Sequence, residues 1–172
     1  MKPSWSRSLA GIALGVVLAA PQLASAAAEE ESFVDRLGGH FGVAVPIVSV
    51  ADGHATTVDE FTVIAIPMGI GLRNAVGPLA FDMELVPSVA EGHDVDLTIH
   101  PGLIYPGKFA AVGLRAAFEV DSNAYGFTAL LARPIQIGEF VTLFIELDVP
   151  VRFPAGPVGS VVGVATHVGV AF

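Results

Sequence analysis

From Gly39 onward, bulky apolar residues alternate with small or polar residues at a period of two. This period is typical of β-strands whose two faces meet different surroundings. Turn-forming pairs such as Asp52-Gly53 and Pro106-Gly107 separate the alternating runs. The pattern predicts eight strands, at residues 39–50, 60–73, 78–89, 94–106, 109–121, 124–136, 139–153 and 160–172. These runs exceed the usual strand of about 5–6 residues and match the tilted strands of about 9–11 residues, plus their ends, that cross a bilayer.

The two faces of the predicted strands differ in chemistry. In the seventh strand one face carries Val141, Leu143, Ile145, Leu147, Val149, Val151 and Phe153, and the other carries Thr142, Phe144, Glu146, Asp148, Pro150 and Arg152. In the last strand Val162, Val164, Thr166, Val168 and Val170 oppose Gly163, Ala165, His167, Gly169 and Ala171. One face is therefore bulky and apolar, and the other combines small residues with charges.

The direction of the bulky face separates two classes of barrel. A soluble lipocalin-like barrel would turn this face inward and leave mainly Gly and Ala on its surface. Soluble surfaces are about 25–35% charged, whereas this chain is 53% hydrophobic and only 15% charged. A membrane barrel turns the bulky face to lipid and packs small and charged residues in its narrow interior. We therefore expect an all-β fold, a closed eight-stranded antiparallel up-and-down transmembrane β-barrel without free edges.

The first 26 residues have the order of a secretory signal peptide. Lys2 and Arg7 precede a twelve-residue apolar run at 9–20, and small residues follow it. A run of that length is short of the roughly 20 residues that a spanning helix needs. We expect cleavage after Ala26 or Ala28, a short periplasmic lead at 27–38, and the barrel at 39–172.

Composition narrows the function further. The 172 residues include 8 basic and 17 acidic residues, for a net charge of −9. Removing the two basic residues of the leader takes the net charge to −11. Such an acidic chain is a poor partner for nucleic acid, because little in it can neutralise phosphates. The absence of Cys excludes disulfides and Cys-based zinc sites, and no motif calls for a cofactor.

Aromatic residues of the apolar register fall near the strand ends. Phe41, Phe81, Tyr105 and Phe172 lie near one set of ends, and Phe118, Tyr125, Phe127 and Phe153 lie near the other. Two aromatic girdles at the two interfaces are typical of transmembrane barrels. Phe61, Phe109, Phe140 and Phe144 fall in the other register.

The last strand ends in Phe172, preceded by Val170 and Val168 at alternate positions. This resembles the C-terminal signature that the barrel-assembly machinery reads in bacterial outer-membrane proteins. Together with the signal peptide and eight strands, the chain resembles small outer-membrane barrels of the OmpA/OmpX kind. The resemblance implies an outer-membrane location, both termini in the periplasm, and outward loops at 51–59, 90–93, 121–124 and 154–159. Loops this short argue against an adhesin or receptor.

Charged side chains fall on the face predicted to line the interior. They are Asp82, Glu84, Asp96, His100, Arg115, Glu119, Glu146, Asp148, Arg152 and His167, with His40 in the same register. Because unpaired charges are costly in a low dielectric, we interpret them as a structural network of Arg–carboxylate pairs. The alternative interpretation is a narrow cation-preferring pore, since carboxylate rings select cations.

Three further expectations concern ligands and chemistry. Acidic residues of the outward loops could bind divalent cations that bridge lipopolysaccharide, but a dedicated metal site of His54 and His93 would need two separate loops, so no metal site is expected. A soluble lipocalin-like binder of apolar ligands remains a second alternative. A lipid-modifying outer-membrane enzyme is a third, although Ser49 and Ser160 have no evident His and acid partner for nucleophilic chemistry. No enzymatic activity is therefore expected.

Overall fold

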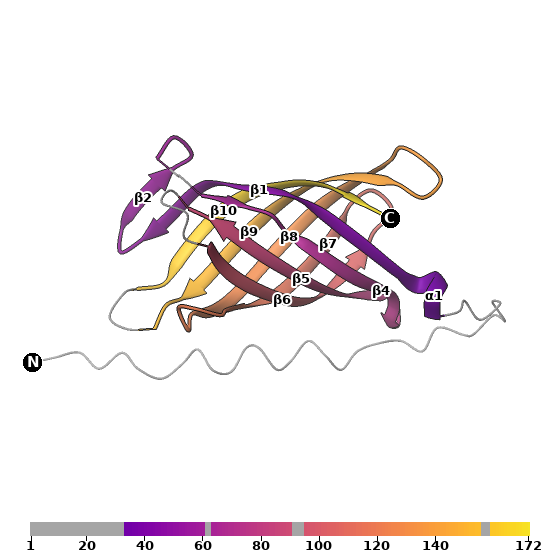
Figure 1. Cartoon of the computed structure of the whole chain (residues 1–172), viewed down its shortest axis with the longest axis horizontal. Coiled ribbons are helices and arrows are strands. Elements are labelled where there is room, and N and C mark those ends of the chain that lie inside the picture. The colour runs from indigo at the N-terminus through magenta and orange to yellow at the C-terminus, as the bar shows by residue number, and fades with distance from the viewer. Residues whose placement is uncertain (1–32, 61–62, 91–94, 156–158) are drawn as a thin grey trace, which may run out of the picture. The chain divides into compact units, whose positions relative to one another are not determined.

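A computed structural model describes residues 33–60, 63–90, 95–155 and 159–172. After a four-residue helix, α1 (Phe33–Arg36), the strands are β1 (Leu37–Ala51), β2 (His54–Thr57), β3 (Ile64–Ala65), β4 (Met68–Val76), β5 (Leu79–Val89), β6 (Val95–Pro106), β7 (Ala111–Glu119), β8 (Tyr125–Gln136), β9 (Thr142–Phe153) and β10 (Val161–Ala171). Strands β5 to β10 pair antiparallel in chain order, β3 and β4 both pair with β1 and β5, and β10 pairs with β1, which closes the sheet. Figure 1 shows the strands winding obliquely around the barrel. Within the described residues, no helix is both long and apolar enough to cross a membrane.

The closed eight-stranded antiparallel barrel predicted from the alternation is confirmed, and the second strand differs from its predicted form. The run 60–73 is not continuous: β3 and β4 together fill the place between β1 and β5. They are separated at Ile66 and Pro67, because proline has no N–H to give to the ladder. The Ile66 N–H donates to the Pro87 carbonyl and the Pro67 carbonyl accepts from Gly42, both at 2.9 Å. The break therefore stays sealed within the barrel wall.

The first outward loop also differs from the prediction. Residues 51–59 were expected to form a loop, but β1 extends to Ala51 and pairs with β2 in a hairpin. Asp52 and Gly53 both have positive φ, 49° and 80°, as a two-residue hairpin turn with the twist of its strands requires. We call this end of the barrel, where β5, β7 and β9 end and β6, β8 and β10 begin, the loop end. The opposite end, with α1 and Phe172, is the terminal end (Figure 1).

The seam of the barrel runs between its first and last strands. The pairing of β1 with β10 extends from His40–Ala171 to Ala51–Val161, with a bulge between Pro46 and Val48. At the terminal end Gly39 and Phe172 exchange two backbone hydrogen bonds, of 2.8 and 2.9 Å. The backbone polar groups at the end of the seam are thus paired.

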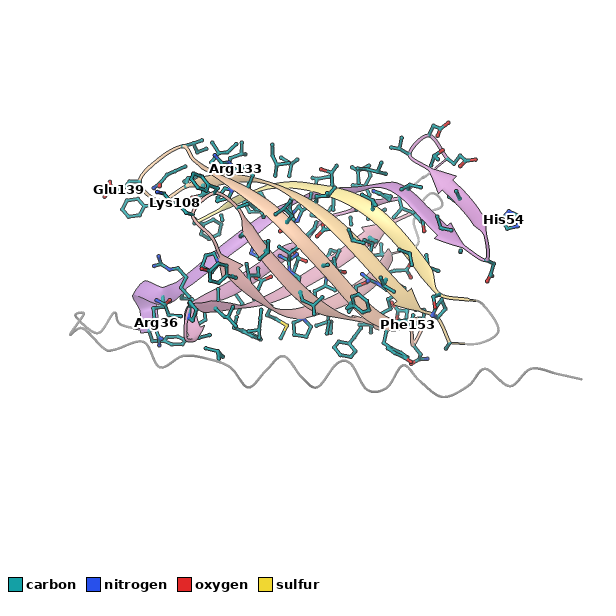
Figure 2. The ribbon with its side chains drawn as sticks, turned by 180° about the vertical axis from the view of Figure 1, so that it is seen from behind. Arg36, His54, Lys108, Arg133, Glu139 and Phe153 are labelled. Atoms are coloured by element: carbon teal, nitrogen blue, oxygen red, sulfur yellow. The ribbon has the colours of Figure 1, made fainter. Side chains whose placement is uncertain are left out.

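The bulky register faces outward. Among the outward positions of β5 to β10 only Arg133 is charged, and apolar side chains such as Leu114, Leu131 and Leu147 are exposed there. Figure 2 shows charged residues at the barrel ends instead, with Lys108, Arg133 and Glu139 at the terminal end. The inward register holds the buried polar residues. This orientation is the reverse of the one that a lipocalin-like barrel needs.

The aromatic residues of the apolar register also face outward. Phe41, Phe81, Tyr105, Phe118, Tyr125, Phe127 and Phe172 are exposed, and Phe153 is half-exposed. Tyr125 and Phe127 each contact the Phe153 ring at the loop end, with ring centroids 5.5 and 6.4 Å apart. Phe144 points inward and is buried, as its register predicts, while Phe109 and Phe140 are exposed in terminal-end turns.

Several predicted features lie outside the described residues. These are the signal peptide at 1–26, residues 27–32 of the lead, Phe61, and residues 91–93, which include His93, and 156–158 of the loops at 90–93 and 154–159.

Candidate functional site

The middle of the barrel interior is a layer of charged side chains, which we call the ionic layer: His40, Asp82, Glu84, His100, Arg115, Glu146, Asp148 and His167. Each of these residues is buried or half-buried. Glu84, Glu146, Arg115 and Asp82 are no more than 3% exposed. Charges this deep are stable only when they are paired.

One row of the layer crosses four strands. The register places His40, Gly69, Glu84 and His100 side by side on β1, β4, β5 and β6. The His40 ring lies over Gly69, whose Cβ, if present, would be 2.8 Å from His40 Nε2. His40 Nε2 thereby reaches Glu84 Oε1 at 3.1 Å, and His100 Nδ1 lies 3.2 Å from Glu84 Oε2. Two imidazoles therefore flank one carboxylate.

A second row of the layer has the same arrangement, with a glycine that makes room for Arg115. Asp82, Gly102 and Arg115 lie in register on β5, β6 and β7. A Cβ at Gly102 would come within 2.5 Å of Arg115 Cγ, so the missing side chain leaves room for the arginine. Arg115 Nε donates to Asp82 Oδ2 at 2.8 Å, and its Nη1 donates to Glu146 Oε1 at 2.7 Å. The guanidinium thus joins both sides of the barrel.

The far side of the layer is formed by β9 and β10. Glu146 and Asp148 share one face of β9, and His167 pairs with Glu146 on β10. His167 Nδ1 lies 3.4 Å from Glu146 Oε1. Asp148 Oδ1 and His167 Nε2 are buried without a hydrogen-bond partner. The Phe144 ring packs edge-on against His167, with centroids 4.8 Å apart, and against His40 at 6.0 Å.

A second arginine links the layer to the loop end. Arg152 Nη2 lies 3.0 Å from His100 Nε2, and its Nη1 donates to Thr128 Oγ1 at 3.2 Å. Its Nε lies 3.5 Å from Glu119 Oε1, which is nearer solvent. Because arginine can only donate, His100 Nε2 must accept, and the Nδ1 proton of His100 is then donated to Glu84. The arginine thereby fixes the tautomer of His100.

Two cavities lie on either side of Arg115. The larger, of about 280 Å³, is on the loop side, and Ser88, Glu119 and Arg152 are among its lining residues. The smaller, of about 170 Å³, is on the terminal side, with Pro134 and Thr142 among its lining residues. Arg115 borders both. Each has room for several waters, which occupy about 30 Å³ apiece, and the ionic layer lies between them.

Nine of the ten residues proposed from the sequence contribute to the ionic layer or border it. Asp96 does not: it is exposed at the loop-end start of β6, opposite Ser88, and no hydrogen bond joins it to the other nine in the described structure. The alternation of apolar and polar residues predicts that Asp96 points inward, but Asp96 lies at the start of its strand, where the side chain is exposed to solvent.

The sequence reasoning missed the role of the glycines. Gly69 and Gly102 make the space over which His40 and Arg115 reach their carboxylates. The signal was present in the inward register, where small residues alternate with large ones, as small barrels require.

Comparisons with known proteins identify no relative: no protein-family model, no curated protein and no solved structure matches the chain.

Proposed function

We propose that the protein is an integral β-barrel of a bacterial outer membrane with a structural role, in which the ionic layer is the stabilising core. The observation that carries this proposal is the reversed polarity of the barrel. Away from its two ends, its outward register is apolar, and the charged residues at that level face the interior. A surface with so much exposed Val, Leu, Ile and Phe is unfavourable in water and favourable against lipid.

Closure supports the same proposal. In hydrocarbon every backbone N–H and C=O must be paired within the protein. The continuous pairing from β1 round to β10, with the break at Pro67 sealed by two hydrogen bonds, meets that requirement. The one charged outward residue of β5 to β10, Arg133, lies near the terminal end (Figure 2), where a long side chain can reach the interface.

Features of the sequence support the proposed location and partners of the barrel. The leader at 1–26 would export the chain, and the Phe172 terminus would be read by the barrel-assembly machinery. Outer-membrane lipids and lipopolysaccharide would surround the wall, with divalent cations bridging lipopolysaccharide to acidic loop residues. Nucleic acid is not a partner of so acidic a chain.

Tryptophan fluorescence tests the orientation of the two faces. The only Trp is Trp5, so the mature chain offers a background without tryptophan. We expect Leu147→Trp, on the outward face, to be quenched by brominated phosphatidylcholine in reconstituted vesicles. Phe144→Trp, on the inward face of the same strand, is the matched control and should resist quenching. Equal quenching at both positions, or none at Leu147→Trp, would contradict the proposal.

A narrow cation-preferring pore is the second candidate function, favoured by the two cavities that meet at Arg115. Its carboxylates would attract cations from either end. Planar-bilayer recordings of the purified barrel test it, with Glu119→Gln and Glu146→Gln compared with the unmodified chain. A cation current that falls in these variants supports a pore; the structural proposal predicts no steady current.

The lipid-modifying alternative has no such observation in its favour. In the described part of the chain, no serine hydroxyl is hydrogen-bonded to a histidine. Mass spectrometry of lipid A from cells that express the protein tests this alternative directly. An altered acylation pattern would require an enzymatic function in place of the structural one.

A further inference from the structure

We propose that Glu146, Asp148 and His167 bind a divalent transition-metal cation of the Zn²⁺ class inside the barrel. One ligand atom from each of the three residues lies within 4.8 Å of those of the other two, and all three residues are buried. Glu146 and Asp148 project from one face of β9, and β10 brings His167 directly beside Glu146. The site needs the closed barrel and does not depend on the membrane around it.

The second observation is an unpartnered carboxylate oxygen. Asp148 is 8% exposed, and its Oδ1 is buried without any hydrogen-bond partner. Such an atom carries the full cost of desolvation unless something pairs with it. Arg115 and Arg152 donate their hydrogen bonds to other groups, so neither guanidinium satisfies this oxygen.

Charge balance in the ionic layer points the same way. The layer holds the carboxylates of Asp82, Glu84, Glu146 and Asp148 and the guanidinium of Arg115. His100 is neutral in the tautomer that Arg152 imposes. These four carboxyl groups outnumber the two guanidinium groups, that of Arg115 in the layer and that of Arg152 at its border. A divalent cation between Glu146 and Asp148 would be attracted by both, and a low dielectric makes the attraction strong.

The donor set indicates the class of metal. Imidazole nitrogen suits Zn²⁺ and related first-row cations, whereas Ca²⁺ and Mg²⁺ prefer all-oxygen sites. One imidazole with two carboxylates leaves a coordination position for water, which the adjoining cavity can supply. Asp148 and His167 both line the 280 Å³ cavity on the loop side. That cavity also gives the cation a path from the loop end.

The observed spacing fits a shared ion better than a direct hydrogen bond. His167 Nδ1 and Glu146 Oε1 are 3.4 Å apart, beyond the usual N–H···O range of about 2.7–3.2 Å. Two ligands at about 2.0–2.2 Å from one tetrahedral Zn²⁺ are themselves roughly 3.3 Å apart. Arg115 donates to Glu146 Oε1 and would act as the outer-shell partner that holds this carboxylate in place. A carboxylate oxygen has two lone pairs, so Oε1 can accept this hydrogen bond and still face the ion.

The test uses the tag-free mature barrel in detergent, stripped with chelator and titrated with Zn²⁺ alone. We expect one Zn²⁺ per chain by calorimetry and by elemental analysis. Asp148→Asn should weaken binding by about 100-fold or more, since losing even an outer-shell partner costs about 10–100-fold. Asp96→Asn, which removes the same charge from an exposed position, is the matched control and should bind as the unmodified chain does.

A second readout identifies the ligands independently of the variants. Co²⁺ in place of Zn²⁺ should give a visible spectrum of low coordination number, and X-ray absorption should report one imidazole among oxygen neighbours. Where Asp148→Asn does not fold, His167→Gln takes its place. Absence of stoichiometric Zn²⁺ uptake, or equal affinity in Asp148→Asn, would overturn the proposal. Either result can be obtained whether or not the membrane assignment holds.

Discussion

Arg115 Nε lies 2.8 Å from Asp82 Oδ2, although the two residues stand on strands that are not neighbours. The strand between them contributes Gly102, over which the arginine side chain passes. A narrow barrel of eight strands has an interior just wide enough to be filled by side chains. The ion pair and the glycine are therefore parts of one arrangement, and each can be tested separately.

Replacing Arg115 by Met should destabilise the folded barrel. Arg115 pairs with Asp82 and Glu146 at 2.8 and 2.7 Å, and its loss leaves buried carboxylates without a cation. Removing one partner of a buried pair costs about 3–5 kcal/mol. Equilibrium unfolding in guanidinium, followed by gel mobility of the folded form, measures the change.

Two comparisons make that measurement specific. Arg133→Met removes an exposed, outward arginine and should change the stability by about 0.5 kcal/mol or less. Asp82→Asn combined with Arg115→Met should recover part of the loss, because the two residues are directly coupled. A loss in Arg133→Met as large as that in Arg115→Met would contradict the structural role of the ionic layer.

Gly102→Ala tests whether the glycine makes room for the arginine. An added Cβ would meet Arg115 Cγ at 2.5 Å and the Leu114 carbonyl at 2.8 Å. We expect a loss of about 1–3 kcal/mol from overpacking. Gly138→Ala, at a position with open space around it, should be nearly neutral in the same unfolding assay. Equal effects at the two positions would mean that Arg115 does not depend on Gly102.

Val168→Arg tests whether the apolar wall faces lipid. Val168 faces outward on β10 and pairs with Val43 and Ile145 on the two neighbouring strands. An arginine near the bilayer midplane costs about 2–4 kcal/mol, and near the interface about 0–1 kcal/mol. Val162→Arg, on the same face near the loop end, is the matched control. Reversible folding into phospholipid vesicles should separate the two variants; a neutral Val168→Arg would argue against burial in lipid.

Phe172→Ala tests the terminal signature. The Phe172 ring lies against Gly39, and the Phe172 backbone completes the seam with two hydrogen bonds. Since alanine keeps those backbone bonds, we expect refolding in detergent to proceed almost as before, while assembly in cells declines. Phe140→Ala, another exposed aromatic at the terminal end, serves as the control. Normal amounts of folded Phe172→Ala in the envelope would contradict a role in assembly.

The barrel could be predicted from the sequence because the alternation that indicates it is visible within each strand. An outward Leu147 beside an inward Glu146 is visible in the alternation of β9, and the same period repeats along the chain. Pro67 shows the limit of this reasoning: its missing N–H predicts an irregularity, but the hydrogen bonds that keep the strand in place come from Gly42 and Pro87, which are distant in sequence. The hairpin of β2 was missed because its short strand pairs with the end of β1, beyond the barrel wall.

The sequence could predict which residues form the ionic layer but not which of them pair with one another. An odd or even position along a strand is enough to indicate whether a side chain points inward. The bond from Arg115 to Asp82 depends on the register between β5, β6 and β7, which local patterns do not define. Asp96 has the same parity as His100, yet it lies at the strand end in solvent. The grouping of Glu146, Asp148 and His167 likewise required knowing that β9 and β10 pair at Glu146 and His167.

The proposed place of this barrel in the outer membrane, with its apolar face toward lipid, can be tested directly in cells. Cells that express the full-length chain should be fractionated, and each fraction should be run on SDS gels with and without boiling. The account predicts a species in the outer-membrane fraction whose mobility changes on boiling, because a closed barrel resists SDS until it is heated. A soluble periplasmic species whose mobility is unchanged by boiling would contradict it.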